Sequence, residues 1–192
     1  MSSLRRIRAG LTAGPGKATR PAGTRLAGTP LAVRRPGPVH GRMMVFVDGG
    51  SRGNPGPAGA GAVVYDSGGR LVSGRGRPLG HATNNEAEYA GLLLGLELAR
   101  ELGAERLEVR ADSELLVRQM RGEYRVRAGN LRGLADRARG LLGGFAQAVF
   151  VAVPRELNRR ADRLADRAMD SGAEVAEGPE GPVTAGGERS ER

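Results

Sequence analysis

The segment from Thr83 to Gly103 most constrains the fold, because its residues predict a helix that is apolar nearly all round. Thr83 or Asn84 can cap the start of this helix, and Gly103 ends it. A helix that is apolar on both sides has to be packed between two layers. We therefore predict an α/β fold in which this helix lies between a sheet and other helices. One apolar stripe contains Ala87, Ala90, Gly91, Leu94 and Leu98, and the other contains Tyr89, Leu92, Leu93 and Leu96.

Five apolar runs of strand length surround this helix in the sequence. They are Met43–Val47, Gly59–Tyr65, Arg70–Gly76, Arg106–Ala111 and Gln147–Val153. A turn at Asp66–Gly69 makes the second and third runs a hairpin. Further helices are expected at Ser113–Arg121, Leu131–Leu142 and Arg159–Asp170, the last of them capped by Asn158. This order indicates a mixed sheet, in which an antiparallel hairpin unit is followed by parallel strands.

Charge is distributed unevenly along the 192 residues. Residues 1–42, a basic arm rich in Arg, Gly and Pro, hold nine of the thirty Lys and Arg residues and no acid. Residues 171–192 hold five Glu and two Arg, with several Gly and Pro. Both ends lack an apolar period and are expected to be disordered, which leaves residues 43–170 as one folded domain. The arm is open to three explanations: a nucleic-acid tether, a transit peptide, or an extension upstream of a true start at Met43 or Met44.

The composition also excludes several kinds of site. The chain has no Cys, which rules out disulfides, thiolate metal sites and a thiol nucleophile, and its two His residues do not suffice for a multi-histidine zinc site. No apolar stretch approaches the ~20 residues of a membrane-spanning helix. The arm lacks the apolar core of a secretory signal. We therefore expect a cytoplasmic monomer without a membrane partner.

Four carboxylates lie where the predicted elements alone do not need them. Asp48 and Asp112 each follow an apolar strand at its C-terminal end, the rim at which sites collect in open α/β sheets. Glu88 lies in the first turn of the apolar helix, and Asp162 lies at the edge of the last helix's apolar face. Each also has a structural explanation. Asp48 can start a turn, Asp112 can cap a helix, Glu88 can favour the helix dipole, and Asp162 can be a solvated charge.

A cluster of these four acids would require a cation. Two carboxylates ~4–5 Å apart repel by roughly 3–4 kcal/mol at an effective dielectric of about 20. Closely packed carboxylates therefore raise one another's pKa unless a cation lies between them. Oxygen ligands without Cys or a nearby His point to Mg²⁺ or Mn²⁺. Two such ions would serve phosphodiester hydrolysis, by activating a water and stabilising the leaving oxygen.

Four motifs, in order, resemble those of the type-one ribonuclease H family. They are Asp48-Gly49-Gly50-Ser51 with Gly53-Asn54-Pro55-Gly56, Thr83-Asn84-Asn85-Glu86-Ala87-Glu88-Tyr89, Ala111-Asp112-Ser113, and Val153-Pro154-Arg155-Glu156-Leu157-Asn158 with Ala161-Asp162 and Leu164-Ala165. The resemblance covers about residues 43–170. It implies a ribonuclease H-like, five-stranded mixed sheet flanked by helices, and cleavage of the RNA strand of RNA–DNA hybrids with two Mg²⁺ ions. By motif position the catalytic and metal-binding residues would be Asp48, Glu88, Asp112 and Asp162, whereas Glu86 is a first-turn acid.

Contacts to the hybrid are expected from small polar groups beside these acids. Telling RNA from DNA requires contact with 2′-hydroxyls across a wide minor groove. Backbone amides and short side chains allow the necessary close approach, and turn or cap chemistry is the structural alternative for the Asn residues among them. The candidates are Gly49, Ser51, Asn54, Asn84 and Asn85, with Arg155 as a cation.

The chain departs from the family pattern at three places. Ala152 lies near the position where many members have a His that assists product release, so we expect slower turnover, with Arg155 a partial substitute through its charge. Glu114 stands where several members have a hybrid-contacting Gln. Gly122–Asn130 lacks Trp and a dense basic cluster, so the basic protrusion of some members is missing. Affinity for the hybrid would then come from the arm or from a group of arginines, which could equally form a solvated surface without a binding role. These are Arg118, Arg121, Arg125 and Arg127.

The sequence thus predicts a Mg²⁺-dependent ribonuclease H that leaves 5′-phosphate and 3′-hydroxyl ends, as the family does. The alternative is a non-catalytic module of the same fold that binds hybrids or structured RNA, although a binder gains nothing from acids that face phosphates. A related exonuclease is a third candidate, but those usually carry Asp-x-Glu on the first strand, where this chain has Gly50. Primers, R-loops and embedded ribonucleotides all stay open as the physiological substrate.

Overall fold

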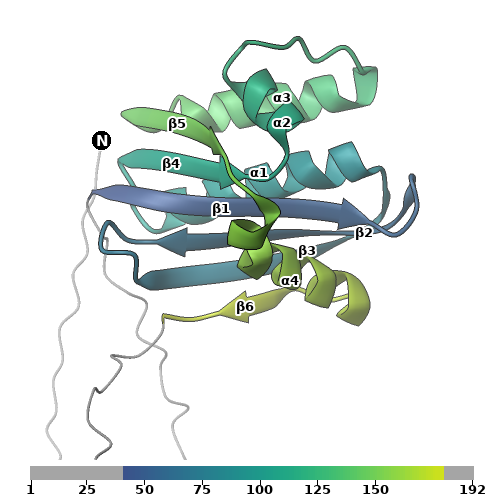
Figure 1. Cartoon of the computed structure of the whole chain (residues 1–192), viewed down its shortest axis with the longest axis horizontal. Helices are drawn as coiled ribbons and strands as arrows, with labels where there is room; N and C mark the ends of the chain where they lie inside the picture. The colour runs from purple at the N-terminus through teal and green to yellow at the C-terminus, as the bar shows by residue number, and fades with distance from the viewer. Residues whose placement is uncertain (1–40, 180–192) are drawn as a thin grey trace, which may run out of the picture. The chain divides into compact units, whose positions relative to one another are not determined.

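The structure is a computed structural model that describes residues 41–179, which form six strands and four helices (Figure 1). The strands are β1 (Arg42–Ser51), β2 (Gly56–Tyr65), β3 (Leu71–Ala82), β4 (Arg106–Ala111), β5 (Gln147–Ala152) and β6 (Val175–Glu177). The helices are α1 (Asn84–Glu101), α2 (Glu114–Met120), α3 (Gly129–Leu142) and α4 (Arg155–Ser171).

The six strands form one mixed sheet in the order β5-β4-β1-β2-β3-β6. β1, β4 and β5 run parallel, whereas β1–β2, β2–β3 and β3–β6 are antiparallel pairs. The predicted combination of an antiparallel unit, parallel strands and flanking helices is therefore confirmed. The predicted number of strands was one too low, because β6 adds to the free edge of β3.

β6 corrects the expectation that all of residues 171–192 form a disordered tail. Its three residues pair with Gly74, Arg75 and Gly76 of β3. Glu177 also accepts hydrogen bonds from Arg160 at 2.9 Å and from Arg167 at 3.3 Å, both on α4. The free edge of β3 and the two arginines of α4 therefore provide the partners that order β6.

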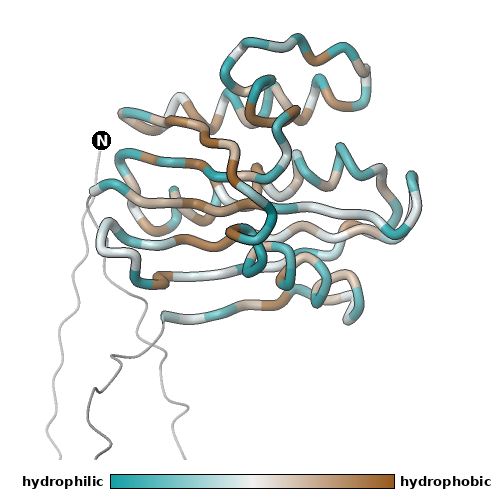
Figure 2. The backbone as a smooth tube through the Cα atoms, viewed as in Figure 1, coloured by the Kyte–Doolittle hydropathy of each residue, from teal (hydrophilic) through white to brown (hydrophobic). Residues whose placement is uncertain are grey.

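Helices cover both faces of the sheet. α4 lies in front of the sheet in Figure 1, and α1 and α3 lie behind it. α4 is coloured mostly hydrophilic in Figure 2, which agrees with a helix that buries only one face. α1 instead has ten buried residues, as predicted from its two apolar stripes.

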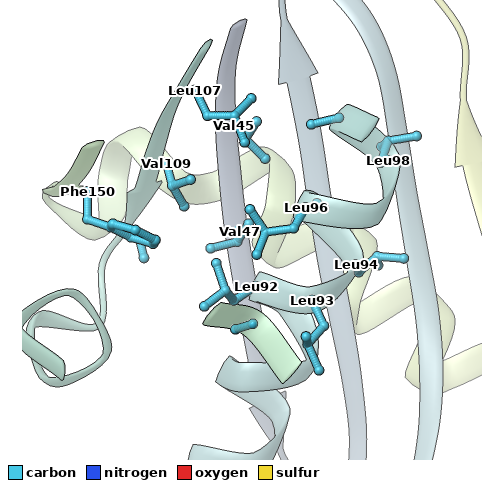
Figure 3. Packing of buried hydrophobic residues seen from close by; sticks show 14 of the residues in the cluster. Val45, Val47, Leu92, Leu93, Leu94, Leu96, Leu98, Leu107, Val109 and Phe150 are labelled. Atoms are coloured by element: carbon cyan, nitrogen blue, oxygen red, sulfur yellow. The ribbon is translucent and has the colours of Figure 1, made fainter. Parts of the chain in front are cut away.

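The main hydrophobic core lies between strands β1 to β5 on one side and α1, α2 and α3 on the other. In Figure 3, Leu92 and Leu96 of α1 point toward Val47 of β1. A smaller cluster packs α4 against the opposite face, where Ala161 and Leu164 meet the hairpin of β2 and β3. The sheet is therefore held at the middle of three layers.

Several boundaries differ from the prediction for reasons of pairing. β1 was expected to end at Val47, but it continues to Ser51 because β2 pairs with it as far as Ser51↔Ala58. α4 begins at Arg155 with Pro154 as its N-cap, so the predicted cap at Asn158 was wrong and this residue lies inside the helix. By contrast, β4 has the predicted bounds.

Residues 1–40 and 180–192 lie outside the described part of the chain. Most of the basic arm and most of the acidic tail lie there, so the predictions for them concern residues outside the described range. The exception is the end of the arm, because Arg42, predicted to be disordered, is the first residue of β1 and pairs with Arg106 of β4. Within residues 41–179, no helix combines the length and the apolar character needed to cross a bilayer.

Candidate active site

Asp48 lies in the part of β1 that extends beyond its pairing with the parallel strand β4. The parallel pairing of β1 with β4 ends at Phe46↔Arg110, whereas the pairing with β2 includes Asp48↔Gly61. Asp48 is partly buried and does not start a turn. Asp112 follows the last residue of β4 directly. Because β1 and β4 are parallel, these carboxylates lie at the same edge of the sheet.

Glu88 is positioned by the start of α1. Thr83 caps the helix and forms a capping box with Glu86, whose carboxylate accepts from the Thr83 backbone N–H at 2.8 Å. Glu86 thus fulfils the first-turn role, and Glu88, half a turn further on, is not needed for it. The helix lies very close to β1, since a Cβ on Gly49 would be 1.9 Å from the backbone oxygen of Ala87.

Asp162 comes from the opposite layer. It lies on α4, which contacts the sheet equally closely, because a Cβ on Gly61 would be 2.0 Å from the backbone oxygen of Ala161. The Asp162 carboxylate accepts from the Arg155 guanidinium at 3.0 Å. The four predicted carboxylates therefore come from two strands and from helices on both faces of the sheet.

Asn158 is a site residue that the sequence reasoning missed, because it was assigned to a helix cap. Its side chain is buried, and its amide nitrogen donates to the backbone oxygen of Val47 at 2.9 Å. The same nitrogen lies 2.9 Å from Oδ1 of Asp112 and 3.3 Å from Oδ1 of Asp48. Its own Oδ1 is buried without a hydrogen-bond partner among the described residues. Its position one turn before Asp162 on the same helix face could have indicated this role from the sequence.

Ser113 is the second residue that was missed as a site residue. It is the N-cap of α2, where its hydroxyl oxygen accepts from the backbone N–H of Leu116 at 3.3 Å. The same hydroxyl donates to Oε2 of Glu88 at 2.6 Å. Ser113 therefore takes the capping role that was the structural alternative for Asp112, and it leaves the Asp112 carboxylate free to face the cleft.

One cleft of about 330 Å³ joins these groups, and all four predicted carboxylates line it. Of the predicted hybrid contacts, Gly49, Ser51, Asn84 and Arg155 also line the cleft.

The remaining two predicted contacts, Asn54 and Asn85, are not among the residues that line the cleft. Asn54 accepts from the backbone N–H of Asn84 at 3.2 Å, and the Asn84 side chain donates to Glu88 at 3.2 Å. Asn54 therefore acts on the cleft through Asn84. Asn85 is exposed on the first turn of α1.

Crowding of the carboxylates has an electrostatic cost. Burial, followed by the charges of Asp112 and Asp162, raises the pKa of Asp48 to about 7, and Arg155 opposes this shift. Burial likewise raises the pKa of Glu88, although the hydrogen bond from Ser113 counteracts it. At neutral pH the Asp48 carboxylate is therefore close to taking up a proton, as expected where a cation is needed.

The cleft fits a hard divalent cation in its chemistry, but the ligands are not preassembled. Within residues 41–179, no three or more His, Asp or Glu side chains are grouped closely enough to hold a metal ion as they stand. Arg155 holds Asp162, and Ser113 and Asn84 hold Glu88. The oxygen donors nevertheless match a hard divalent cation better than a softer metal. A bound ion would have to exchange these internal partners.

The arginines expected to bind the hybrid differ in their surroundings. Arg118 pairs with Glu114 and lies over the ring of Tyr124, with 5.2 Å between its guanidinium carbon and the ring centroid. Arg121 donates to the backbone oxygen of Phe150 at 2.6 Å and so ties α2 to β5. The side chains of Arg125 and Arg127 line a separate hollow of about 410 Å³ beside Tyr124. These two are the better candidates for phosphate contacts.

Comparison with known proteins agrees with this geometry. Residues 46–168 match the family model described as "Reverse transcriptase-like". The "Ribonuclease HI" of Halobacterium salinarum is 44% identical over 130 residues, which are 68% of this chain and 65% of that protein. The "Bifunctional protein Rv2228c" of Mycobacterium tuberculosis is 45% identical over 136 residues, which are 70% of this chain and 37% of that protein. The chain thus spans less than two thirds of the length of these relatives.

Solved structures show the same likeness. The RNase H1 of Halobacterium salinarum NRC-1 matches with a TM-score of 0.66 at 43% identity, covering 68% of this chain and 98% of that one. LC11-RNase H1, solved in complex with an RNA/DNA hybrid, matches with a TM-score of 0.65 at 39% identity, covering 68% of this chain and 98% of that one. With the matched segment, the sheet topology and the four motifs in agreement, the chain belongs to the type 1 ribonuclease H family.

Proposed function

We propose that this chain is an endonuclease that hydrolyses the RNA strand of RNA–DNA hybrids. The observation that carries the proposal is the meeting of Asp48, Glu88, Asp112 and Asp162 in one cleft. Burial, together with the charges of Asp112 and Asp162, raises the pKa of Asp48, which supports a cation-binding role for this group. The names of the similar proteins, ribonuclease HI and an RNase H1 bound to an RNA/DNA hybrid, support the same activity.

We propose two Mg²⁺ ions as cofactors, with Mn²⁺ as a substitute, held by the four carboxylates. When bound, such ions activate the attacking water and stabilise the leaving oxygen of the phosphodiester. The chain's own groups prepare this site. Asn158 donates to Asp48 and Asp112 at once and so keeps two mutually repelling carboxylates side by side. Ser113 fixes the orientation of Glu88 by donating to its Oε2.

Recognition of the RNA strand is proposed for the rim of the cleft. Gly49, Ser51 and Asn84 line this rim and offer backbone amides and short polar groups to 2′-hydroxyls. Arg155 supplies a cation at the end of the cleft where Ala152 provides no imidazole. We expect turnover to be slower than in relatives that have a His there, because a guanidinium does not exchange protons near neutral pH.

The test is cleavage of a strand-labelled RNA–DNA hybrid in Mg²⁺ by the wild type and by Asp48→Asn. We expect the wild type to cut only the RNA strand and the variant to lose this activity. Asp136→Asn is the matched control, because Asp136 is an exposed carboxylate on α3 that pairs with Arg139. Undiminished cleavage by Asp48→Asn would overturn the proposal. Tight hybrid binding without turnover in Mg²⁺ or Mn²⁺ would instead support the non-catalytic binding module.

We also propose that the protein acts as a monomer in the cytoplasm. All four carboxylates come from a single chain, so the cleft needs no second copy. Light scattering of the purified protein tests whether it is a monomer. Fractionation of cells that express it tests whether it lies in the cytoplasm.

A further inference from the structure

Arg52 has a fixed backbone and a largely exposed side chain that lines the cleft. It follows the last residue of β1, and its N–H donates to the backbone oxygen of Pro57 at 2.8 Å. The loop packs tightly against it, since a Cβ on Gly56 would be 2.1 Å from the Arg52 backbone oxygen. The side chain lines the cleft but stays 58% exposed. Arg52 can therefore exchange partners without a rearrangement of the loop.

The present partner of Arg52 is an acid on α4. Its guanidinium lies 2.6 Å from the Asp170 carboxylate, which is itself 56% exposed. Asp162, Asp166 and Asp170 follow one another at intervals of four residues and share one side of the helix. The hydrogen bond and charge of Asp170, with a smaller contribution from Asp166, raise the pKa of the Arg52 guanidinium. The ion pair thus joins the β1–β2 loop to the C-terminal part of α4.

The charges of the cleft make this pairing significant for an anionic ligand. Among the described residues that line the cleft, five are acidic and two, Arg52 and Arg155, are basic. Acids of α4 neutralise both cations, Arg155 through Asp162 and Arg52 through Asp170. A polyanion that enters the cleft therefore meets no unpaired cation among these residues. One of the two ion pairs has to open before an arginine of the cleft can bind a strand phosphate.

We propose that Arg52 binds a backbone phosphate of the nucleic-acid substrate, and that Asp170 competes with this phosphate in the free protein. The proposal rests on the proposed function, since it assumes an RNA–DNA hybrid in the cleft. Arg52 is the better candidate of the two cations, because Asp162 and Arg155 lie among the catalytic groups. An exposed ion pair contributes little stability, whereas phosphate accepts two hydrogen bonds from one guanidinium. The exchange of Asp170 for a phosphate is therefore favourable.

The experiment measures binding of a fluorescein-labelled RNA–DNA hybrid by anisotropy, in EDTA to prevent hydrolysis. Relative to the wild type, we expect Asp170→Asn to lower Kd by about two- to fivefold, because it releases Arg52 from an exposed pair. Arg52→Gln should raise Kd and reduce the slope of log Kd against log salt by about one, the loss of one phosphate contact. The double variant should bind like Arg52→Gln alone, because Asp170 acts through Arg52.

Asp136→Asn is the matched control, since it removes another exposed, ion-paired carboxylate, this one from α3, and should leave Kd unchanged. Thermal unfolding of each variant verifies that it is folded. Hybrids with uncharged methylphosphonate links in the RNA strand or in the DNA strand identify which strand supplies the phosphate. The effect of Arg52→Gln on Kd should disappear with the hybrid whose uncharged links lie in the strand that Arg52 contacts.

Two results would overturn the proposal while leaving the proposed function intact. In the first, the tighter binding of Asp170→Asn persists in the Arg52→Gln background, so that Asp170 acts only by repelling the substrate. In the second, Arg52→Gln changes neither Kd nor the salt slope. If the wild type binds no hybrid at all, the proposed function fails as well, so the two failures are distinguishable.

Discussion

Asp48 shows what a buried carboxylate costs the folded chain. Burial and the neighbouring acids raise its pKa from the ordinary value of 3.8 to about 7. Between these pH values the folded chain keeps a proton that the unfolded chain has released. The free energy of unfolding therefore falls as pH rises from about 4 to 7, and the destabilisation is complete above the folded-state pKa.

Replacing this carboxylate by an amide should stabilise the fold. In EDTA, we expect Asp48→Asn to increase the free energy of unfolding by about 2–4 kcal/mol at pH 8, because the amide carries no charge to bury. The gain should be small at pH 4, close to the ordinary pKa of 3.8, and should vanish well below it, where Asp48 is protonated in both states. Urea unfolding at several pH values measures it, with Asp136→Asn as the control. A gain of equal size at pH 4 and pH 8 would contradict this electrostatic origin.

Asn158 acts on the same carboxylates by hydrogen bonding. We expect Asn158→Ala to lower kcat, or to raise the Mg²⁺ concentration for half-maximal activity, by about ten- to a hundredfold, as loss of a residue that orients metal ligands does. Asn130→Ala is a suitable control, because Asn130 donates to Glu86, outside the cleft. The Mg²⁺ midpoint of thermal stabilisation supplies a readout that is independent of turnover. An unchanged midpoint and unchanged kcat would show that Asn158 only fills space.

At the scale of elements, glycines allow both helix layers to reach the edge of the sheet where the cleft lies. Gly49 lies against the backbone of α1 near Glu88, and Gly61 lies against the backbone of α4 near Asp162. These two glycines therefore allow the helices to pack closely on the strands. A side chain at either position would push a carboxylate-bearing helix away from the sheet.

Gly61→Ala tests this packing. The new Cβ would lie 2.0 Å from the backbone oxygen of Ala161, and no side-chain rotation can relieve that contact. We expect a loss of about 1–3 kcal/mol in the free energy of unfolding, together with lower activity because Asp162 moves. Gly133→Ala is the matched control, since the space around Gly133 in α3 is open. It should stabilise the fold by up to about 1 kcal/mol. Equal effects of the two changes in urea unfolding would refute the close-packing argument.

At the scale of the molecule, the cleft joins the three layers of the fold. Asp48 and Asp112 belong to the sheet edge, whereas Glu88 and Asp162 belong to helices on opposite faces. A cation shared by these groups would link all three layers, in addition to neutralising their repulsion. Cation binding should therefore be visible in the global stability of the chain.

We expect Mg²⁺ at about ten times its dissociation constant to raise Tm by about 3–6 °C, because it binds the folded state alone. At one fixed Mg²⁺ concentration the shift should be larger at pH 8 than at pH 6, because protons compete for Asp48, whose pKa is raised to about 7. Asp48→Asn should lose most of the shift and Asp136→Asn should keep it. Differential scanning calorimetry measures both, and an equal shift in all three proteins would mean that Mg²⁺ binds elsewhere.

The sequence by itself determined the features that depend on neighbouring residues. The apolar α1 with its Thr83 cap, the bounds of β4 and the turn at Asp66–Gly69 all follow from local patterns, and the structure confirms them. The motif order also identified the four acids, which the structure brings together in one cleft.

Only the tertiary structure decided which partners those residues have. Asn158 contacts Asp48 across 110 positions of the chain, so its local resemblance to a helix cap was misleading. β1 runs past Asp48 because β2 pairs with it, and β6 exists because β3 and α4 provide its partners. Local propensities involve neighbours in sequence, whereas these roles depend on contacts that form only when distant segments meet.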